Sequence, residues 1–388
     1  MSEAGATAPD PTDVIFDLTV LHEITIEVAA ADLTVLVTDR TKRTPCKVTF
    51  DGREVPMATA HRKGLSTGSS TKPSLVLDFD DLVPGQKLHG VDKLVLNNAL
   101  QDPTFVNEHL GYEVYRMAGQ AAPRTAHGLV TINGKPYGLY IIEEATDKQF
   151  LTRWFGKAFN DGNLYEGSLH DFVADQTAGK WPNDLTLKNE VEDKRTRDDI
   201  IALANLVKTA PTADYEAKLS QKFDFSAFIT AFAIDMILCT WDDYFYAANN
   251  YYLYDNPRDS RFVLLPHSPD WLFSARATFP TSRPEPNLDP FVPLASLKAG
   301  IGPGRMAARV REIPALEAKL RAEVGRVIRK VWDVAALRAR IDRVETTLHT
   351  NKRTDAKFVA DIASFDKQAP VMRDVLGKRK TYIEMLTP

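Results

Sequence analysis

The first third of the chain is dominated by short stretches in which apolar and polar residues alternate. This period of two predicts strands at ITIEVA, LTVLVT, CKVTF, SLVLDF and LVLNN. Asp51-Gly52 lies between two such stretches, and Asn133-Gly134 has alternating residues on both sides. Asn-Gly between strands predicts a tight hairpin, because both residues accept the positive φ angles of such a turn.

One segment among these strands has helical spacing instead. Residues 103–119, PTFVNEHLGYEVYRMAG, carry apolar side chains three and four positions apart. Asp102 is a suitable N-cap, Pro103 suits the first helical position, and Gly119 suits the stop. The pattern therefore predicts a single helix within a strand-rich region.

From about residue 146 the apolar spacing becomes helical. A short helix is expected at DKQFLTRWFG, and further helices are expected at 198–209, 212–223 and 226–242. Two strands, YYLY and RFVLL, interrupt this pattern, and Pro- and Gly-rich loops fill 277–304. Residues 305–384 then read as one amphipathic helix after another.

Together these patterns predict an α+β fold with two lobes. Residues 1–13 read as a linker, 14–148 as a β-rich lobe that contains one helix, and 149–388 as a mainly helical lobe. The second lobe includes the strand pair and flanking polar residues at 241–273. A cleft between two lobes is a frequent place for a small ligand such as a nucleotide.

Composition and charge narrow the function classes. The 388 residues are 44% apolar and 26% charged, and the net charge is −4 with both signs interspersed. This is typical of a globular protein and gives no indication of a nucleic-acid partner or a charged membrane surface as ligand. No apolar run reaches the ~20 residues of a membrane-spanning helix, and the longest one, around 228–241, contains Asp235.

Residues 1–13 and the two cysteines give little information about the location of the protein or its chemistry. The N-terminal segment lacks the basic start and apolar stretch of a signal peptide, so a cytoplasmic location is open, as is prior removal of an export segment. Cys46 and Cys239 lack the spacing of a metal site, and a single bridge between them is left open. The sequence does not indicate an oligomeric state.

The segment 241–273 carries the most suggestive polar residues. Asp242 and Asp243 end an apolar stretch, Asn249 and Asn250 open the first strand, and Asp270 follows the second strand. Mg²⁺ prefers carboxylate and amide oxygens and keeps several waters. Asp242 is the best candidate for a base that orients an attacking hydroxyl, and either asparagine could hold Mg²⁺ with Asp270. Simple helix-end polarity and an ordinary turn would account for the same residues.

Residues 61–72, HRKGLSTGSSTK, could hold phosphate. Glycine and small hydroxyl residues permit close approach of backbone amides to phosphate oxygens, and Arg62, Gly64, Ser66 and Ser69 are the candidate nucleotide-binding positions. The segment is not a Walker A loop, because no Gly-Lys-Ser/Thr occurs at the required spacing. An ordinary hairpin loop is the alternative interpretation.

Lys72 immediately precedes a predicted strand, where a lysine usually points to solvent. Its functional interpretation is contact with nucleotide phosphates, supported by a carboxylate from the following helix, as in kinase sites. Glu108 is well placed in sequence for that pairing, and Glu113 is the competitor. Glu144 ends the second strand of the Asn-Gly hairpin, where a strand end can offer backbone groups to an adenine ring.

Five segments, in order, resemble the CotH family of spore-coat kinases, which are atypical kinases distantly similar to protein kinases. They are RKGLSTGSSTKPSLVLDFD, LVLNNALQDPTFVNEHLGYEVYRMAGQAAPRT, INGKPYGLYIIEEATDKQFL, GNLYEG and WDDYFYAANNYYLY. The resemblance covers roughly 16–388 and is weakest over 176–222 and in the C-terminal helices.

This resemblance implies an atypical protein-kinase-like, two-lobed fold and ATP-dependent phosphorylation of Ser or Thr in a protein substrate, with Mg²⁺ or Mn²⁺. It implies that Lys72 contacts phosphates, that Glu108 is its helix partner and that Asp242 is the catalytic aspartate. Asn250 and Asp270 are implied to lie near the metal. Family members are often found in spore coats or outside the cell, which makes an extracytoplasmic or spore-associated location the expected one.

One departure from the family pattern concerns the metal. The family has Pro-Trp-Asp-x-Asp after the second strand, whereas this chain has Pro266-His267-Ser268-Pro269-Asp270. A serine hydroxyl is a weaker Mg²⁺ ligand than a carboxylate. Asp243 stands where the family has Gly and could contribute a compensating carboxylate.

Three functions follow from this pattern. The first is an active Ser/Thr protein kinase. The second is a pseudokinase, a nucleotide-binding or scaffold module inactivated through Ser268. The third is a kinase-fold enzyme that transfers another group, such as AMP, or uses a small-molecule acceptor.

Overall fold

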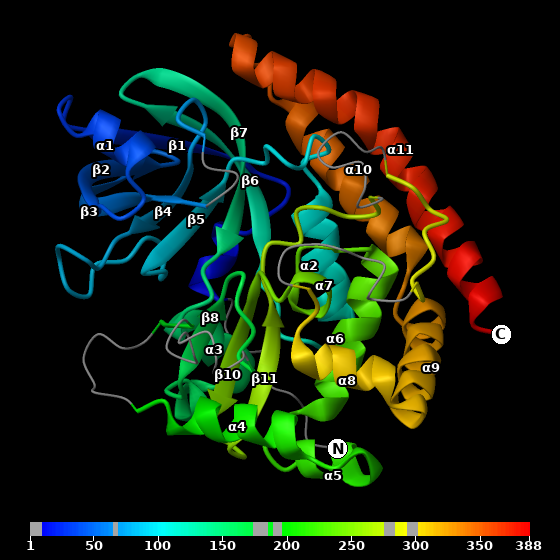
Figure 1. The fold of residues 1–388 in the computed structure, drawn as a ribbon. Coiled ribbons are helices and arrows are strands. Elements are labelled where there is room, and N and C mark those ends of the chain that lie inside the picture. Colours follow the sequence, from blue (N-terminus) through cyan, green and yellow to red (C-terminus); the bar gives the residue numbers. More distant parts are fainter. Residues whose placement is uncertain (1–9, 65–68, 174–184, 189–195, 275–283, 293–301) are drawn as a thin grey trace, which may run out of the picture. The chain divides into compact units, whose positions relative to one another are not determined.

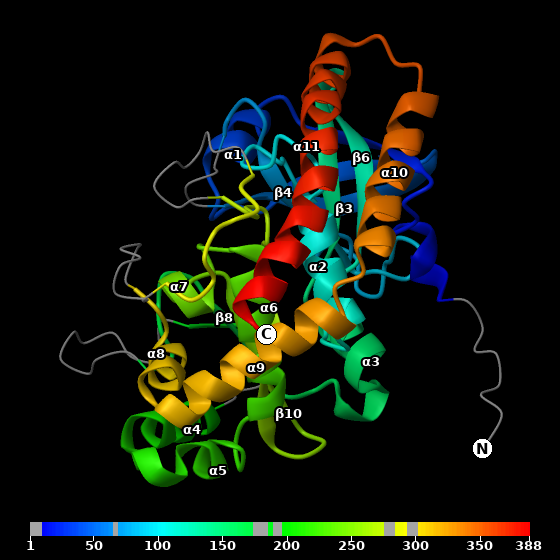
Figure 2. The ribbon, with the colours of Figure 1, turned by 90° about the vertical axis from the view of Figure 1, so that its right-hand side faces the viewer.

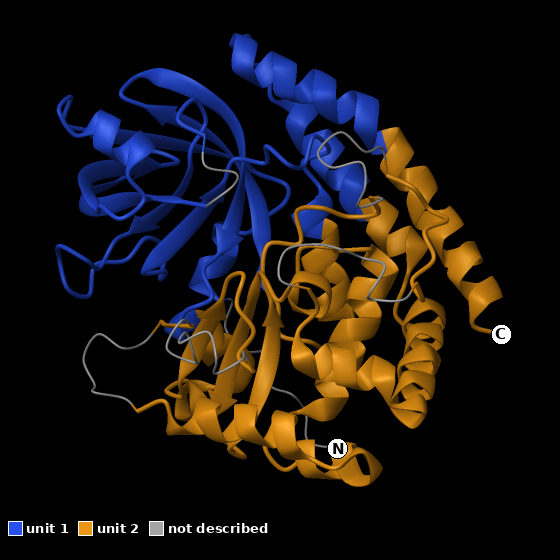
Figure 3. Ribbon diagram, viewed as in Figure 1, with its two compact units in different colours: residues 1–109, 123–149, 340–369 blue, residues 110–122, 150–339, 370–388 orange. Residues whose placement is uncertain are grey.

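The computed structural model describes residues 10–388 apart from 65–68, 174–184, 189–195, 275–283 and 293–301. The chain forms two compact units, shown in different colours in Figure 3. Unit 1 comprises residues 1–109, 123–149 and 340–369, and unit 2 comprises residues 110–122, 150–339 and 370–388. Unit 1 thus combines segments of the first 149 residues with one segment near the C-terminus. The lobe boundaries expected from the sequence stay a prediction.

The strands of unit 1 form a closed barrel (Figure 1). In chain order they are β1 (Leu21–Val28), β2 (Thr44–Phe50), β3 (Arg53–Lys63), β4 (Ser74–Asp78), β5 (Lys93–Asn97), β6 (Thr125–Ile132) and β7 (Lys135–Glu144). The order around the barrel is β1-β2-β3-β4-β5-β7-β6, and a parallel pairing of β1 with β6 closes it. The sequence predicted the strands but not the closure. The interior is filled by buried aliphatic and aromatic side chains, as expected for a small barrel.

Both predicted hairpin turns are confirmed. Asn133 has a φ angle of 48° and Gly134 has one of 75°, which are the two positive values that a tight turn requires. Asp51 and Gly52, at 48° and 80°, repeat this arrangement between β2 and β3. The Asn133 side chain also bonds to the backbone N–H and carbonyl of Val28 on β1, which ties the turn to the seam of the barrel.

The predicted strand LTVLVT is wrong, because this segment forms helix α1 (Leu33–Thr38). A strand with one buried face would bury every second residue, but in α1 only Leu36 is buried. Leu33, one helical turn earlier, packs against the same core. Short apolar runs are compatible with both the strand period of two and the helical spacing of three or four. Here the two residues that face the core, Leu33 and Leu36, are three positions apart, which is a helical spacing.

Helix α2 (Asn107–Met117) begins later than the sequence predicted. Asp102 accepts hydrogen bonds from the backbone N–H groups of Thr104 and Asn107, at 2.9 and 2.8 Å. It therefore stabilises the turn before the helix and still contacts the first helical N–H group. Its burial raises its pKa to about 6.

Two long helices contribute to unit 1 at the far end of the chain: α10 (Val334–Thr350) and α11 (Ala356–Leu386). Within unit 1 their segments 340–350 and 356–369 lie side by side (Figure 2). His349 on α10 lies 2.8 Å from the carboxylate of Asp366 on α11. Thr347 donates a hydrogen bond to the Leu18 carbonyl, which fixes α10 to the segment before β1.

Unit 2 contains a four-stranded sheet with the order β11-β10-β8-β9. The strands are β8 (Leu164–Gly167), β9 (Thr186–Leu187), β10 (Tyr251–Asn256) and β11 (Arg261–Pro266). The predicted β10–β11 pair is confirmed, and its register places Tyr251 opposite Pro266. The residues just before β10 and just after β11 therefore meet at the same end of the hairpin.

The remaining helices confirm the helical pattern after residue 146, although those found at 215–219 and 225–238 are shorter than the predicted 212–223 and 226–242. They are α3 (Lys148–Phe155), α4 (Asp198–Thr209), α5 (Tyr215–Leu219), α6 (Phe225–Leu238), α7 (Tyr244–Ala247), α8 (Arg305–Glu312) and α9 (Pro314–Lys330). Asp224 caps α6 by accepting a hydrogen bond from the Ala227 N–H. Helix α6 is apolar on nearly all sides and is almost wholly buried, as expected for a central helix.

Helix α6 ends where Cys239 adopts a φ angle of 53°. The fully buried guanidinium of Arg379, from α11, donates hydrogen bonds to the carbonyls of Ile237 and Met236 at this end, at 2.7 and 3.0 Å. Cys239 and Cys46 are both free and buried, so the bridge that the sequence left open is not formed. Among the described residues, no helix is both long and apolar enough to cross a bilayer.

Candidate functional site

The turn after α6 presents a carboxylate that organises two amides. Asp242 Oδ1 accepts a hydrogen bond from the side-chain amide of Asn249 at 2.9 Å. Its Oδ2 accepts one from the amide of Asn250 at 3.1 Å. The carboxylate predicted as the base and the asparagines predicted near the metal are therefore in direct contact.

The two asparagines differ in what their carbonyl oxygens do. Asn249 Oδ1 accepts a hydrogen bond from the Leu169 N–H at 2.8 Å, and the residue is buried. Asn249 therefore fastens the turn to the segment after β8. Asn250 uses its amide nitrogen for Asp242, and no hydrogen bond from another described residue reaches its carbonyl oxygen. Of the two, Asn250 is the one whose oxygen is available to a ligand.

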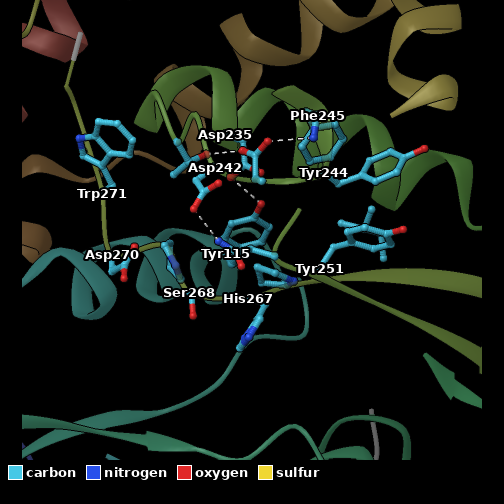
Figure 4. A pocket seen from close by; sticks show the side chains of 16 residues that line it. Tyr115, Asp235, Asp242, Tyr244, Phe245, Tyr251, His267, Ser268, Asp270 and Trp271 are labelled. Atoms are coloured by element: carbon cyan, nitrogen blue, oxygen red, sulfur yellow. Dashed lines mark hydrogen bonds between the residues drawn. The ribbon is translucent and has the colours of Figure 1, made fainter. Parts of the chain in front are cut away.

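Asp242 and Asn250 line a pocket of about 400 Å³, including space open to solvent, together with Ser268 and Asp270. Asp242 comes from the turn after α6, whereas Ser268 and Asp270 come from the segment after β11 (Figure 4). All four belong to unit 2. Asp242 and Asp270, which lie before and after the hairpin in sequence, thus line the same pocket.

The backbone around the pocket adopts uncommon conformations. Ala248, Asn250 and Ser268 have φ angles of 46°, 45° and 50°. Such left-handed residues cost free energy unless they are Gly or Asn, and they cluster at functional sites. The Ser268 N–H is held by the hydroxyl of Tyr112, at 2.9 Å, which stabilises the turn that aims Ser268 and Asp270.

Gly111 permits this arrangement. A Cβ atom at residue 111 would lie 2.8 Å from side-chain carbons of Pro269, well inside van der Waals contact. The absence of a side chain lets the second part of α2, which belongs to unit 2, approach the 266–270 segment closely.

A pair of buried carboxyl groups lies at the back of the pocket. Asp235 on α6 accepts a hydrogen bond from the Tyr115 hydroxyl at 2.7 Å and is hydrogen-bonded to Asp243. Burial raises the pKa of Asp235 to about 6. Burial, followed by the neighbouring charge of Asp235, raises the pKa of Asp243 well above its usual range. Two adjacent buried carboxyls cannot both ionise easily, so the pair shares one proton at neutral pH.

Asp243 has a structural role that limits its use as a compensating metal ligand. Its Oδ1 accepts the backbone N–H groups of Phe245 and Tyr246, at 2.8 and 3.1 Å, and its Oδ2 accepts the Thr240 hydroxyl. It is thus the N-cap of α7 and is nearly inaccessible. The expectation that it replaces the carboxylate lost at Ser268 is not supported.

Lys72 and Glu108, the predicted ion pair, both lie in unit 1 but have other partners. The Lys72 ammonium lies 3.6 Å from a carboxylate oxygen of Asp361 on α11. Glu108 Oε1 accepts a hydrogen bond from the Asn97 amide at 2.6 Å, in a buried setting. The pairing of Lys72 with Glu108 is therefore corrected to Lys72 with Asp361. The functional roles of Lys72 and Glu108 stay predictions.

The predicted nucleotide-binding positions are partly engaged in local contacts. Arg62 donates to the carbonyls of Val37 and Thr38, and Ser69 accepts the backbone N–H of Lys72. Gly64 has a φ angle of 90°, which permits a close backbone approach. Ser66 lies outside the described residues.

Glu144, the last of these positions, forms an ion pair with Arg124 at 2.8 Å. Its carboxylate therefore contributes to the structure of the β6–β7 pair, and its backbone N–H donates to the Arg124 carbonyl at 2.9 Å. The contact of this strand end with an adenine ring stays a prediction.

The site residues thus form two groups. Asp242, Asn250 and Asp270 line one pocket of unit 2, whereas Lys72, Glu108, Arg62, Gly64, Ser69 and Glu144 belong to unit 1. The expectation that Lys72 faces the metal-binding groups stays a prediction.

Sequence reasoning missed the roles of Asp235, Tyr115 and Asp361. The sequence did indicate a polar contact for Asp235, because an acidic residue inside an otherwise apolar helix needs a polar partner when buried. The sequence did not indicate the contact of Asp361 with Lys72, because the two residues lie far apart along the chain.

The residues lining the pocket fit a hard divalent cation. Asp242, Asp270, Asn250 and Ser268 all offer oxygen atoms, which Mg²⁺ and Mn²⁺ prefer over nitrogen or sulfur. The Asn250 amide donates to Asp242, so that its carbonyl oxygen is the atom left for a cation. The donor set contains fewer carboxylates than the family pattern would supply, because Ser268 is neutral.

Comparison with solved structures gives only remote likeness. The proinflammatory kinase CtkA of Helicobacter pylori aligns with 81% of this chain and 95% of its own, at 8% identity and a TM-score of 0.31. HipA from Shewanella oneidensis MR-1, solved with HipB and operator DNA, aligns with 89% of this chain and 65% of its own, at 12% identity and a TM-score of 0.33. These scores are too low to carry a structural argument.

The sequence comparisons are more informative. Inner spore coat protein H of Bacillus subtilis (strain 168) is 21% identical over 187 residues, which are 46% of this chain and 49% of that protein. The chain therefore spans about half the length of this curated relative. The family model described as CotH kinase protein matches residues 60–383, which include both groups of site residues. The chain belongs to the CotH kinase protein family.

Proposed function

We propose that this protein is an ATP-dependent atypical Ser/Thr protein kinase with a protein-kinase-like arrangement of two lobes. The observation that carries the proposal is the contact of the Asp242 carboxylate with the amides of Asn249 and Asn250 at the edge of a pocket. A carboxylate held by neighbouring amides, next to oxygen ligands for a cation, is the arrangement that phosphoryl transfer to a hydroxyl requires.

Each residue has a distinct role in this proposal. Asp242 orients the acceptor hydroxyl of a Ser or Thr side chain and accepts its proton. Its two hydrogen bonds to amides keep its carboxylate in a fixed orientation. Lys72 contacts nucleotide phosphates, and the Gly64 region supplies backbone amides to them.

Mg²⁺ or Mn²⁺ would be held by Asn250 and Asp270. When bound, the cation neutralises the charge on the phosphate oxygens and orients the group that is transferred. The protein's own contribution is to hold the two ligands in the segments that flank one end of the β10–β11 hairpin, where Tyr251 lies opposite Pro266.

A pseudokinase is the second candidate, and Ser268 is the observation that favours it. Ser268 lines the pocket at the position where the family pattern has a carboxylate. Asp243 does not replace that carboxylate, because its Oδ1 caps α7 and its Oδ2 accepts the Thr240 hydroxyl. On this alternative the protein binds nucleotide or a partner without turnover.

The decisive experiment is phosphate transfer measured with radiolabelled ATP and either Mg²⁺ or Mn²⁺, with the protein itself and basic Ser-rich peptides as acceptors. We expect transfer by the wild type and a loss of about 100-fold or more in Asp242→Asn, as is typical for a general base. Asp259→Asn is the matched control, because Asp259 is exposed and pairs with Arg261 in the β10–β11 turn.

Three outcomes separate the candidates. Nucleotide-dependent thermal stabilisation without transfer would establish the pseudokinase alternative. The absence of both nucleotide binding and transfer would refute the kinase and the nucleotide-binding form of the pseudokinase, and would leave the scaffold form. Intact-mass analysis of the products distinguishes a phosphoryl group from an AMP group and so tests the remaining alternative from the sequence.

A further inference from the structure

The Lys72 ammonium is enclosed by side chains of unit 1. It lies 5.2 Å from the ring centre of Phe105 and 5.3 Å from that of Tyr140, so aromatic faces contact it on more than one side. The Tyr140 hydroxyl donates to the carbonyl of Pro73, the next residue along the chain from Lys72. The lysine side chain is only 12% exposed. It is therefore not the solvent-directed lysine that usually precedes a strand.

The backbone of Lys72 is equally fixed. Its N–H donates to the Ser69 hydroxyl at 3.1 Å, and its carbonyl accepts the Asn98 side-chain amide at 2.7 Å. These backbone hydrogen bonds fix the position from which the Lys72 side chain extends, and the contacts of the ammonium fix its far end.

One carboxylate pairs with this ammonium in the described part of the chain, and it comes from α11. Asp361 Oδ2 lies 3.6 Å from Lys72 Nζ and accepts the Leu139 N–H at 2.7 Å. The bond to the Leu139 N–H fixes the carboxylate against β7. The distance of 3.6 Å is longer than a good N–H···O hydrogen bond, so the ammonium is oriented while its N–H groups remain available to a further anion.

The backbone of β7 is shaped to receive this carboxylate. Gly138 has a φ angle of 90°, and its position lies at the register shift between β6 and β7. A Cβ atom at residue 138 would overlap the Asp361 carboxylate. β-Bulges often re-aim groups near functional sites, and here the bulge makes room for an acid that comes from the far end of the chain.

Charge and burial support a specific pairing. Burial lowers the pKa of Lys72, and the Asp361 charge opposes that change. Burial likewise raises the pKa of Asp361, and the Lys72 charge opposes that change. The nearby Lys357 disfavours the charged lysine and favours the charged aspartate. Each member of the pair thus favours the charged form of the other, against the effect of burial.

We propose that Asp361 is the positioning carboxylate of Lys72, the role expected of Glu108, and that it holds the ammonium for nucleotide phosphate. The proposal rests on the proposed function for the phosphate contact. Glu108 instead holds the Asn97 amide at the end of β5. The acid that orients the lysine thus comes from the C-terminal helix and not from the helix after β5.

The first experiment tests the pairing without nucleotide. Lysine amines are labelled with an acetylating reagent at several pH values, and labelling of Lys72 is read by peptide mass spectrometry. In Asp361→Asn, which keeps an acceptor for the Leu139 N–H, we expect Lys72 to be labelled several-fold faster than in the wild type. Asp361→Glu should restore slow labelling. Asp366→Asn, a more exposed acid on the same helix, is the control and should leave Lys72 unchanged.

The second experiment measures the affinity for a fluorescent ATP analogue with Mg²⁺ and, in parallel, urea unfolding. We expect Asp361→Asn to weaken nucleotide binding about 10-fold and, in the phosphate-transfer assay, to raise KM by a larger factor than it lowers kcat. Asp361→Glu should recover much of the loss, and Glu108→Gln should weaken nucleotide binding less than Asp361→Asn. In the Lys72→Met background, Asp361→Asn should have little further effect on binding.

The outcomes separate this proposal from the proposed function. Nucleotide binding by the wild type, together with unchanged labelling and unchanged affinity in Asp361→Asn, would overturn only the positioning role. Tighter binding or faster turnover in Asp361→Asn would overturn it too, since Asp361 would then be withholding the lysine. A wild type that binds no nucleotide would overturn both.

Discussion

The side-chain amide of Asn250 donates a hydrogen bond to the Asp242 carboxylate at 3.1 Å, which leaves the carbonyl oxygen of Asn250 as the atom available to a cation. Its neighbour Asn249 donates to the same carboxylate, but its carbonyl oxygen accepts the Leu169 N–H. Two adjacent identical side chains thus differ, because the carbonyl oxygen of Asn249 is bonded within the fold and that of Asn250 is open to a ligand.

This difference predicts opposite consequences for the two asparagines. Asn250→Gly, which suits the positive φ angle at this position, should raise the Mg²⁺ concentration needed for half-maximal activity several-fold and change stability little. Asn249→Ala leaves the Leu169 N–H without its acceptor and should cost about 1–3 kcal/mol of unfolding free energy. Metal titration of activity and urea unfolding check the two variants. Equal metal dependence in both would contradict the assignment.

Ser268→Asp should strengthen metal binding. The change places a carboxylate in the pocket next to Asp270, and Asp tolerates the φ angle of 50° at this position better than most residues. We expect the Mg²⁺ or Mn²⁺ concentration for half-maximal effect to fall about 10-fold, measured by activity or by metal-dependent thermal stabilisation. Ser260→Asp is the control, because Ser260 is exposed in the β10–β11 turn and has a similar φ angle of 54°. A metal response that stays the same in Ser268→Asp would argue that this position does not face the cation.

The buried Asp235–Asp243 pair predicts a pH dependence of stability. The pKa of Asp235 is raised to about 6 and that of Asp243 well above its usual range, so at this pair the folded state binds more protons than the unfolded state above about pH 4. Stability therefore falls as the pH rises through 6, by an amount of the order of 2–3 kcal/mol. In Asp235→Asn the fall should be shallower, because only one carboxyl then titrates. Urea unfolding between pH 5 and 8 measures both slopes, and parallel slopes would show that the pair does not share a proton.

Gly138→Ala should be more harmful than Gly134→Ala, although both glycines have positive φ angles in the same hairpin. At residue 134 an added Cβ meets no atom within 4 Å, whereas at residue 138 it overlaps the Asp361 carboxylate. We expect Gly138→Ala to cost about 1–3 kcal/mol more than Gly134→Ala, through overpacking. It should also raise the labelling of Lys72. Thermal unfolding and the labelling assay provide the comparison, and similar behaviour of the two variants would count against close docking of Asp361.

Local signals predicted the parts of this structure that depend on neighbours in sequence. The turns at Asn133-Gly134 and Asp51-Gly52 could be predicted, because the positive φ angles of a tight turn depend on the two residues within it. The β10–β11 hairpin followed from two apolar runs and a turn, and with it came the proximity of Asn250 to the 266–270 segment. The short run at 33–38 fitted both periods, so the pattern alone did not distinguish helix from strand.

The parts that depend on distant residues could not be predicted. Lys72 meets Asp361 only because α11 returns to β7, and nothing near either residue indicates that contact. Asp243 was considered as a compensating carboxylate because it is an additional acid at a position where the family pattern has Gly. Its three hydrogen-bond donors, at Thr240, Phe245 and Tyr246, become visible only when α7 is built.

The seam of the barrel has a consequence for how unit 1 acquires its structure. β1 pairs in parallel with β6, so the first strand of the chain gains one of its two neighbours only after β6 is available. Pairing two segments that lie so far apart in the sequence requires a long intervening loop to become ordered. This slows the search for the native state. Until β6 has been synthesised, one edge of β1 carries backbone N–H and C=O groups without strand partners. Such an open edge can pair with another chain, so the emerging chain depends on protection from association until the barrel is closed.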